Sequence, residues 1–261
     1  MALGLYIIGD EILSGKRQDK HFSHVQQLLA ARGMQLQWAQ YLGDDPQVLE
    51  QALRASFARG DTVLSCGGIG ATPDDHTRAA SASALDLPLQ LHPQAAELIR
   101  QRIAQASLGE PDSPANQQRL QMGMFPRGSE IIPNPYNQIP GYFLHEHYFV
   151  PGFPVMAWPM IEWVLDTRLQ HLQRLAGYLE RGLIVQGVME SELTPLMQRI
   201  EHEHEQVKVF SLPSVDDPKW GRHIELGVKG EPARVESAFE ALRRGVDELG
   251  AQVRTETVRS I

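Results

Sequence analysis

Cysteine is nearly missing from this chain of 261 residues, since Cys66 is the only one and no disulfide can form within the chain. Long apolar runs are missing too, and no stretch approaches the ~20 apolar residues of a membrane-spanning helix. The apolar opening over 3–8 is short, is not preceded by a basic segment and leads directly into Gly9-Asp10-Glu11, unlike a signal peptide. We therefore expect a cytoplasmic protein without a membrane partner.

Positive charge is also in short supply, with 24 Lys and Arg against 32 Asp and Glu and a formal net charge of −8. Nucleic-acid-binding proteins gather Lys and Arg to displace counterions from phosphates, so we expect no nucleic-acid partner. One small anion held by backbone amides remains compatible with this charge, because such recognition is local. The length suits one domain of about 170 residues and a smaller one.

Strands and helices alternate through the first two-thirds of the chain. This alternation is typical of a mostly parallel sheet with helices on both faces, which places the protein in the α/β class. The expected strands span 3–8, 34–41, 62–65, 131–135 and 142–150, and the expected helices span 19–32, 46–59, 75–85, 93–106 and 156–175, with a loop over 107–116.

The last third has a different order of elements. We expect strands over 183–187, 206–212, 223–229 and 251–257, with helices over 190–202 and 232–249. The order βαββαβ is that of a ferredoxin-like α+β domain. We place the boundary within 172–181, which gives a first domain over 1–175 and a second over 176–261.

The segment from Ser65 to Asp75 combines the end of a strand, three glycines and the start of a helix. Ligands of open parallel sheets bind beyond the carboxyl ends of the strands. Gly67, Gly68 and Gly70 allow backbone amides to approach an anion, and a helix amino terminus adds partial positive charge. The alternative is a tight turn that binds nothing.

Polar loops follow other expected strands and should meet the glycine turn at one edge of the sheet. They span 9–15, 43–45 and 151–154, and their acidic residues, with those after the glycines, are Asp10, Glu11, Asp44, Asp45, Asp74 and Asp75. Carboxylates beside an anion site are explained if a divalent cation bridges them to phosphate. For Asp45 and Asp74 we favour a helix cap or a surface position, and for Asp75 a helix cap competes with metal binding.

Other conspicuous residues are interpreted structurally. Cys66 ends an apolar strand and is expected to be buried and unreactive. The segment His145-Glu146-His147 would place two imidazoles on one face of a strand or turn, but packing is favoured over metal binding. The run 202–205 is interpreted as a solvated helix end.

The chain carries an ordered series of motifs, namely Gly9-Asp10-Glu11-Ile12-Leu13-x-Gly15, Gly43-Asp44, Gly67-Gly68-x-Gly70-x-x-Pro73-x-Asp75, Asn116, Asn134-Pro135, Pro140-Gly141 and Pro151-Gly152-x-Pro154. This series resembles the amino-terminal domain of the competence/damage-inducible protein A (CinA) family, within the molybdopterin-binding superfamily of the MoaB and Mog proteins. The resemblance covers about residues 3–175, and the segment 187–191 is similar to the start of the middle domain of that family.

The resemblance implies a three-layer αβα fold, a homo-oligomer and a small phosphate-bearing ligand, a pterin or a nucleotide. Asp44 and Asp75 match two aspartates linked to catalysis in molybdopterin adenylyltransferases, and Asp75 and Asp10 are the candidate ligands of a divalent metal, Mg²⁺ above all. CinA-type members are associated with metal-dependent hydrolysis of ADP-ribose or related dinucleotides. The implied ligand-binding residues are Gly9, Asp10, Glu11, Gly15, Gly67, Gly68, Gly70, Asn116, Pro151 and Gly152.

The sequence departs from the CinA pattern at positions where the family carries positive charge. Val155-Met156 follows Pro154 in place of a basic residue, and Gln118 stands where many members have lysine. Arg119 and Lys16 are the candidate replacements, and the carboxy-terminal amidase domain of the family has no counterpart in this sequence. Three functions stay open: a metal-dependent nucleotide pyrophosphatase, a binding protein without catalysis, and an adenylyltransferase of molybdenum-cofactor synthesis.

Overall fold

The computed structural model describes residues 2–110, 112–173 and 179–260. Backbone contacts divide the chain into two compact units, one of Met1–Leu29 and Met34–Leu172 and the other of Ala30–Gly33 and Gln173–Ile261. The expected boundary between 175 and 176 lies outside the described residues. No helix in the described part of the chain is long and apolar enough to span a membrane.

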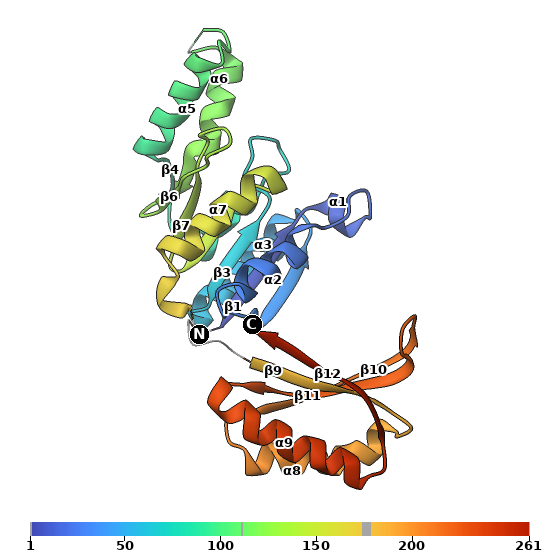
Figure 1. Ribbon diagram of the computed structural model, residues 1–261. Helices are drawn as coiled ribbons and strands as arrows, with labels where there is room; N and C mark the ends of the chain where they lie inside the picture. The colour runs from blue at the N-terminus through green and yellow to red at the C-terminus, as the bar shows by residue number, and fades with distance from the viewer. Residues whose placement is uncertain (1, 111, 174–178, 261) are drawn as a thin grey trace. The chain divides into compact units, whose positions relative to one another are not determined.

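A six-stranded, mostly parallel sheet forms the centre of the first unit, as expected (Figure 1). Four neighbouring strands run parallel, and the last two add an antiparallel meander at one edge. In spatial order the strands are β2 (Trp38–Leu42), β1 (Leu3–Ile8), β3 (Thr62–Cys66), β8 (His147–Val150), β7 (Gly141–Leu144) and β6 (Glu130–Ile132).

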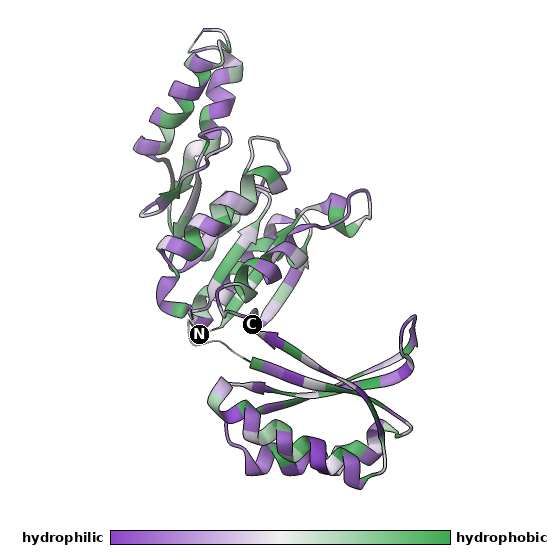
Figure 2. Cartoon of the chain, in the orientation of Figure 1, coloured by the Kyte–Doolittle hydropathy of each residue, from purple (hydrophilic) through white to green (hydrophobic). Residues whose placement is uncertain are grey.

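Helices cover both faces of this sheet, which confirms the three-layer αβα fold. Leu5 and Ile7 of β1 pack on the side of α2 (His21–Ala30) and α7 (Pro154–Thr167). Tyr6 and Ile8 pack on the opposite side, with α3 (Pro46–Arg59) and α4 (Thr77–Ala84). Every residue of β1 and β3 is buried, because parallel strands between two helical layers have no solvent face. Figure 2 shows hydrophobic residues in these strands, with paler positions between them.

Short peripheral elements extend the first unit beyond the expected ones. The expected loop over 107–116 ends early, because Pro114 starts a helix capped by Ser113. Proline is favoured at that first position, where its missing N–H costs nothing. The added elements are α1 (Asp10–Leu13), β4 (Leu89–Leu91), α6 (Pro114–Leu120), η1 (Gln121–Gly123), β5 (Met124–Pro126) and η2 (Gln170–Leu172), and the expected helix over 93–106 is α5 (Pro93–Gln105).

Three expected elements need correction. The strand over 142–150 is a hairpin, in which β7 and β8 are joined at His145 and Glu146 with φ of 47° and 59°. The sequence hides this turn, because left-handed turn positions normally carry Gly, Asn or Asp. The helix over 75–85 begins only at Thr77, so Asp75 precedes it. The helix expected over 156–175 begins at Pro154 and ends at Thr167, and 174–175 lie outside the described residues.

The second unit has the expected βαββαβ order and a four-stranded antiparallel sheet of ferredoxin-like topology. Both of its helices share one core with the sheet, so they cover the same face. The elements are β9 (Leu179–Gln186), α8 (Glu190–Glu203), β10 (Lys208–Asp217), β11 (Gly221–Gly230), α9 (Pro232–Glu248) and β12 (Gln252–Ser260), with the strands in the order β10-β11-β9-β12.

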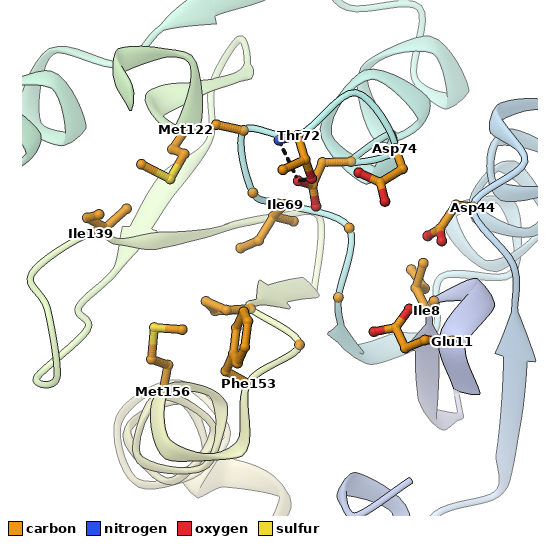
Figure 3. A pocket seen from close by; sticks show the side chains of 18 of the residues that line it. Ile8, Glu11, Asp44, Ile69, Thr72, Asp74, Met122, Ile139, Phe153 and Met156 are labelled. Carbon is orange, nitrogen blue, oxygen red and sulfur yellow. Dashed lines mark hydrogen bonds between the residues drawn. The ribbon is translucent and has the colours of Figure 1, made fainter. Parts of the chain in front are cut away.

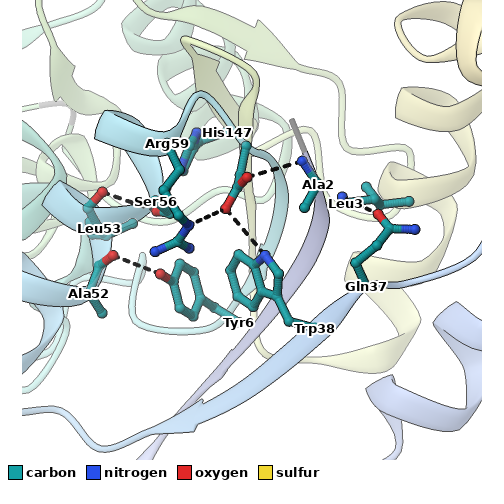
Figure 4. Close-up of polar contacts among 11 residues, drawn as sticks. Ala2, Leu3, Tyr6, Gln37, Trp38, Ala52, Leu53, Ser56, Arg59 and His147 are labelled. Carbon is teal, nitrogen blue, oxygen red and sulfur yellow. Dashed lines mark hydrogen bonds and ion pairs between the residues drawn. The ribbon is translucent and has the colours of Figure 1, made fainter.

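Buried polar groups tie the first unit together at the amino ends of β1 and β3 (Figure 4). His147 is fully buried beside α3, where its ring lies 3.8 Å from the ring of Phe57. Its Nδ1 donates to the His145 carbonyl at 2.9 Å, so in the neutral ring Nε2 accepts from the Ser56 hydroxyl at 2.8 Å. Burial lowers the pKa of His147 to about 4. The His145-Glu146-His147 segment is therefore structural, as favoured from the sequence.

His147 should make the stability of the first unit depend on pH. An unfolded histidine has a pKa of about 6.5, so the unfolded chain binds more protons than the folded one between that value and about 4. We expect stability to be complete above pH 6.5 and to fall by about 3 kcal/mol as the pH drops to 4. Denaturant unfolding across this range measures the slope. The slope should flatten in His147→Gln, and an equal slope in both proteins would contradict the prediction.

Candidate functional site

A cavity of about 500 Å³ opens beyond the carboxyl ends of β1, β3 and β8 (Figure 3). Each strand leads into a lining segment, namely Gly9 after β1, Gly67 after β3 and Pro151 after β8. This is the edge at which parallel sheets bind ligands. The polar loops that the sequence analysis expected to converge therefore meet here.

Most of the candidate site residues line this cavity. Three do not: Asp10 lies behind Asp44, and neither Gly15 nor Asn116 is part of the lining. The lining candidates are Gly9, Glu11, Asp44, Gly67, Gly68, Gly70, Asp75, Pro151 and Gly152, and Asp74, which was not a candidate, lines the cavity as well.

The glycine turn after β3 is fixed by close contacts. Gly67 has φ of +112°, and a Cβ there would overlap the Ile8 carbonyl oxygen, so only glycine lets the ends of β1 and β3 come this close. Its N–H donates to the Val150 carbonyl at 3.0 Å. Thr77 of α4 donates from its Oγ1 to the Gly67 carbonyl and from its N–H to the Gly68 carbonyl. Thr77 was not singled out from the sequence, where nothing distinguishes it.

Backbone donors along the turn are free. Among the described residues, the N–H groups of Gly68, Ile69, Gly70 and Ala71 have no hydrogen-bond partner within the chain. The Gly67 N–H already donates to the Val150 carbonyl. The unpaired N–H groups therefore begin at Gly68, one residue after the first glycine of the motif. A run of unpaired backbone donors at the rim of a cavity is the arrangement that binds phosphate in glycine-rich loops.

Asp75 closes the turn and does not cap a helix. Its Oδ2 accepts from the Thr72 N–H at 2.9 Å and from the Thr72 hydroxyl at 2.5 Å. The cap of α4 is His76, whose side chain makes no capping bond, so the helix-cap alternative is wrong. A Cβ on Gly70 would lie 2.5 Å from Asp75 Oδ2, so Gly70 makes room for this carboxylate. Oδ1 of Asp75 has no hydrogen-bond partner in the described part of the chain.

Asp10 and Asp44 lock the loops after β1 and β2 to each other. The Asp10 N–H donates to Asp44 Oδ2 at 2.9 Å, and the Asp44 N–H donates to Asp10 Oδ1 at 3.2 Å. Burial raises the pKa of Asp44, and the charges of Asp10, Glu11 and Asp74 raise it further, against the lowering effect of the Asp10 N–H. Asp45 caps α3 through the Gln47 and Val48 N–H groups and Asp74 is exposed, as favoured from the sequence.

These carboxylates make one wall of the cavity electronegative without forming a complete metal cage. Within residues 2–110, 112–173 and 179–260, no three His, Cys, Asp or Glu side chains lie close enough to hold a metal ion. Mg²⁺ often binds through only one or two carboxylates, with water and substrate phosphate as its other ligands. One or two of the lining carboxylates Glu11, Asp44 and Asp75 suffice for that mode of binding.

The positive charges at the site differ from those expected. Arg17 lines the cavity and lies over the Phe153 ring at 5.9 Å, whereas Lys16 is not part of the lining. Arg119 instead donates to Asn116 Oδ1 at 2.8 Å. Gln118, in the place of the usual lysine, donates to the Ala71 carbonyl at 2.7 Å and so still contacts the loop.

A second arginine supports the glycine turn from inside. Arg78 is buried, and its guanidinium donates to the carbonyl oxygens of Gly70 and Gln121. Burial lowers its pKa, and the neighbouring Tyr142 and Asp75 oppose that effect. Arg78 therefore holds Gly70 with its carbonyl turned inward. Nothing in the sequence singles out Arg78, because an arginine in the first turn of a helix is normally exposed.

The opposite wall of the cavity is apolar. Figure 3 shows Met122, Ile139, Phe153 and Met156 on one side and Glu11, Asp44 and Asp74 on the other, with Ile69 of the glycine turn between them. Met156 belongs to the segment that departs from the CinA pattern, and Phe153 is the variable position of the matching motif before it. The cavity can thus take a planar apolar ring at one end and a charged group at the other.

Asn116 and Cys66 have structural roles. Asn116 is fully buried, and its Nδ2 donates to the carbonyls of Leu108 at 3.1 Å and Glu110 at 2.8 Å, which fixes the loop before α6. Cys66 is buried at the end of β3, and burial raises the pKa of its thiol, as expected of an unreactive cysteine.

Several known proteins are similar to this chain. Residues 4–171 match the family described as "Probable molybdopterin binding domain". A protein of Aeropyrum pernix is 29% identical over 259 residues, 95% of each chain. A CinA-like protein of an Anaeromyxobacter species is 33% identical over 250 residues, 94% of this chain and 56% of its own, and one from Citrifermentans bemidjiense is 32% identical over 204 residues, 76% of this chain and 47% of its own.

The chain therefore spans about half the length of these CinA-like relatives. Among solved structures, a protein CinA of unknown function from Thermoplasma acidophilum superposes with a TM-score of 0.54 at 24% identity, over 63% of this chain and 96% of the other. At this identity the likeness establishes the fold of the first unit alone.

Proposed function

Since this chain belongs to the molybdopterin-binding domain family, which its residues 4–171 match, we propose that its main cavity binds a phosphate-bearing pterin or nucleotide. The observation that carries the proposal is the run of unpaired N–H groups from Gly68 to Ala71 between an apolar and an acidic wall. A volume of about 500 Å³ lies within the range of pockets for small ligands.

The ligand is oriented by the different chemistry of the two walls. The ring would pack against Phe153, Met156 and Ile139, while the phosphate accepts hydrogen bonds from the glycine turn. Arg78 supports this geometry, because it ties up the Gly70 carbonyl that would otherwise repel phosphate. The pterin and the nucleotide share this combination of flat ring and phosphate, so the geometry accepts both.

A divalent cation completes the proposed site. Four carboxylates line the cavity, Glu11, Asp44, Asp74 and Asp75, and their charge would repel phosphate unless a cation lies between them. Asp75 presents a free Oδ1 for this purpose, and Asp10 supports Asp44 from behind. When bound, Mg²⁺ would neutralise the charge on the phosphates.

The reaction that best fits these groups is hydrolysis of a nucleotide pyrophosphate bond, with ADP-ribose as the test substrate. Asp44 is suited to accept the proton of the attacking water, because its pKa is raised by burial and by Asp10 and Glu11. Its Oδ1 has no hydrogen-bond partner among the described residues. The free N–H groups of the turn would stabilise the charge that develops on phosphate.

Binding and hydrolysis are measured separately. Calorimetric titration with ADP-ribose and with AMP, in Mg²⁺ and in EDTA, should give binding that weakens at least tenfold without the metal. Chromatography should then detect AMP and ribose 5-phosphate from ADP-ribose and water. Metal-dependent binding without products identifies a binding protein, and failure to bind any pterin, AMP or ADP-ribose overturns the proposed ligand class.

A further inference from the structure

A second cavity of about 320 Å³ lies beside the main one. The two share part of their lining, Ile8, Glu11, Arg17, Gly152 and Phe153, so they are neighbours across the wall formed by the loops after β1 and β8. The second cavity extends toward the start of α2, where its lining includes Lys20 and His21. It therefore offers space to a part of a ligand that the main cavity does not hold.

The charge of this second cavity is opposite to that of the first. Arg17 and Lys20 line it, both are exposed, and neither has an ion-pair partner in the described part of the chain. Glu11 is the one carboxylate of its lining, and this side chain folds back on Gly9, where a Cβ would lie 2.6 Å from Glu11 Oε2. A cavity with two unpaired cations attracts an anion.

His21 gives an independent indication of a missing partner. Its side chain is 5% exposed, and its Nε2 contacts the Gly152 carbonyl at 2.9 Å. A carbonyl only accepts, so Nε2 carries the hydrogen. Nδ1 is buried and has no hydrogen-bond partner among the described residues. A buried polar atom without a partner destabilises the fold, and such atoms in proteins are normally satisfied.

We propose that the second cavity is a subsite for an additional anionic group of the ligand, a phosphomonoester or a carboxylate. Arg17 and Lys20 would pair with the anion, and His21 Nδ1 would accept a hydrogen bond from a hydroxyl of the ligand. The subsite rests on the proposed function, since its occupant is the remote end of the ligand held in the main cavity. It would favour ligands that carry one more anionic group than ADP-ribose, such as ADP-ribose 2′-phosphate.

The first test uses inorganic phosphate in EDTA, because binding in the main cavity is expected to need a metal that EDTA removes. In protein labelled with ¹³C-histidine, phosphate should shift the NMR signals of the His21 ring. The His21→Gln variant lacks these signals and so identifies them. The double variant Arg17→Gln and Lys20→Gln should weaken this phosphate binding at least tenfold. Lys16→Gln is the matched control, because Lys16 is an exposed neighbouring cation outside both cavities. All three side chains are exposed, so their replacement should leave the fold intact.

The second test measures preference between ligands. ADP-ribose 2′-phosphate should bind at least tenfold more tightly than ADP-ribose, and the double variant should abolish this preference. The subsite is overturned if the wild type binds both ligands with equal affinity. It is also overturned if phosphate leaves the His21 signals unchanged and shifts only the amides of Gly68 and Gly70, which would leave the main cavity as the anion site. Loss of Mg²⁺-dependent ADP-ribose binding with intact shifts at His21 would instead count against the proposed function alone.

Discussion

Asp75→Asn should reduce metal-dependent hydrolysis or ligand binding about 100-fold while the protein keeps its thermal stability, since single charged groups in such sites contribute on this scale. The carboxylate oxygen that accepts from the Thr72 N–H and hydroxyl is replaced by an amide oxygen that accepts equally well. The turn should therefore survive. What disappears is the negative charge that a divalent cation needs.

The matched control is Asp45→Asn. Asp45 is an aspartate in a different loop, the one after β2. It caps α3 and does not line the cavity. Asparagine caps helices as well as aspartate, so neither stability nor ligand binding should change. Calorimetric titrations with ADP-ribose in Mg²⁺ and in EDTA compare the proteins. If Asp75→Asn binds as tightly as the wild type under both conditions, Asp75 serves only to shape the turn.

Asp61→Ala should lower the free energy of unfolding of the first unit by about 4 kcal/mol, within the range for breaking a buried charge pair. The Asp61 side chain is 3% exposed and accepts from the Ala2 N–H at 3.0 Å, the Trp38 Nε1–H at 3.2 Å and the Arg59 Nε–H at 2.7 Å (Figure 4). Its loss leaves the first two donors unpaired at the edge of the core, where β1 and β2 begin.

The same carboxylate should contribute to acid unfolding. Burial by itself would raise the pKa of Asp61, but the hydrogen bonds from Ala2, Arg59 and Trp38 outweigh burial and lower it below the ordinary value of 3.8. Because the pKa of Asp61 is lowered in the folded state, its contribution to stability is complete above about pH 4. This contribution is lost as the pH falls through the pKa of the folded state. This window lies below that of His147, so the two effects can be separated.

Denaturant unfolding followed by tryptophan fluorescence measures both effects, because Trp38, Trp158 and Trp163 all belong to the first unit. Glu130→Ala is the matched control: Glu130 is 64% exposed and pairs with Arg168 at 3.6 Å, so its removal should change stability by less than about 1 kcal/mol. Equal destabilisation by Asp61→Ala and Glu130→Ala would show that the buried network contributes no more than a surface ion pair.

The elements that sequence patterns located well are those with strong local signals. β1 and β3 are short, mostly apolar runs, and α3 begins at Pro46 after its cap Asp45 and ends before Gly60, which has φ of 64°. Such signals act within a few residues, so they do not depend on the rest of the fold. The hairpin at His145-Glu146 and the helix at 114–120 were missed, because the first uses no typical turn residue and the second is too short to show a period.

The position of the site also followed from the sequence, because parallel strands place all their carboxyl ends at one edge. The roles of individual residues did not. Asn116 and Asp10 both belong to the series of motifs, yet Asn116 fixes a loop and Asp10 supports Asp44. Arg17 and Arg78, which contact the site, carried no signal in the sequence.

The glycines separate most clearly what the sequence determined from what the tertiary structure decided. The sequence by itself determined where the chain turns after a strand, because the glycine clusters and the strand patterns are local. Only the tertiary structure decided why each position must be glycine. Gly67 admits the Ile8 carbonyl, and Gly68 admits the Thr77 hydroxyl. These contacts join segments whose approach depends on the pairing of β1 with β3 and on the seating of α4, which no local pattern encodes.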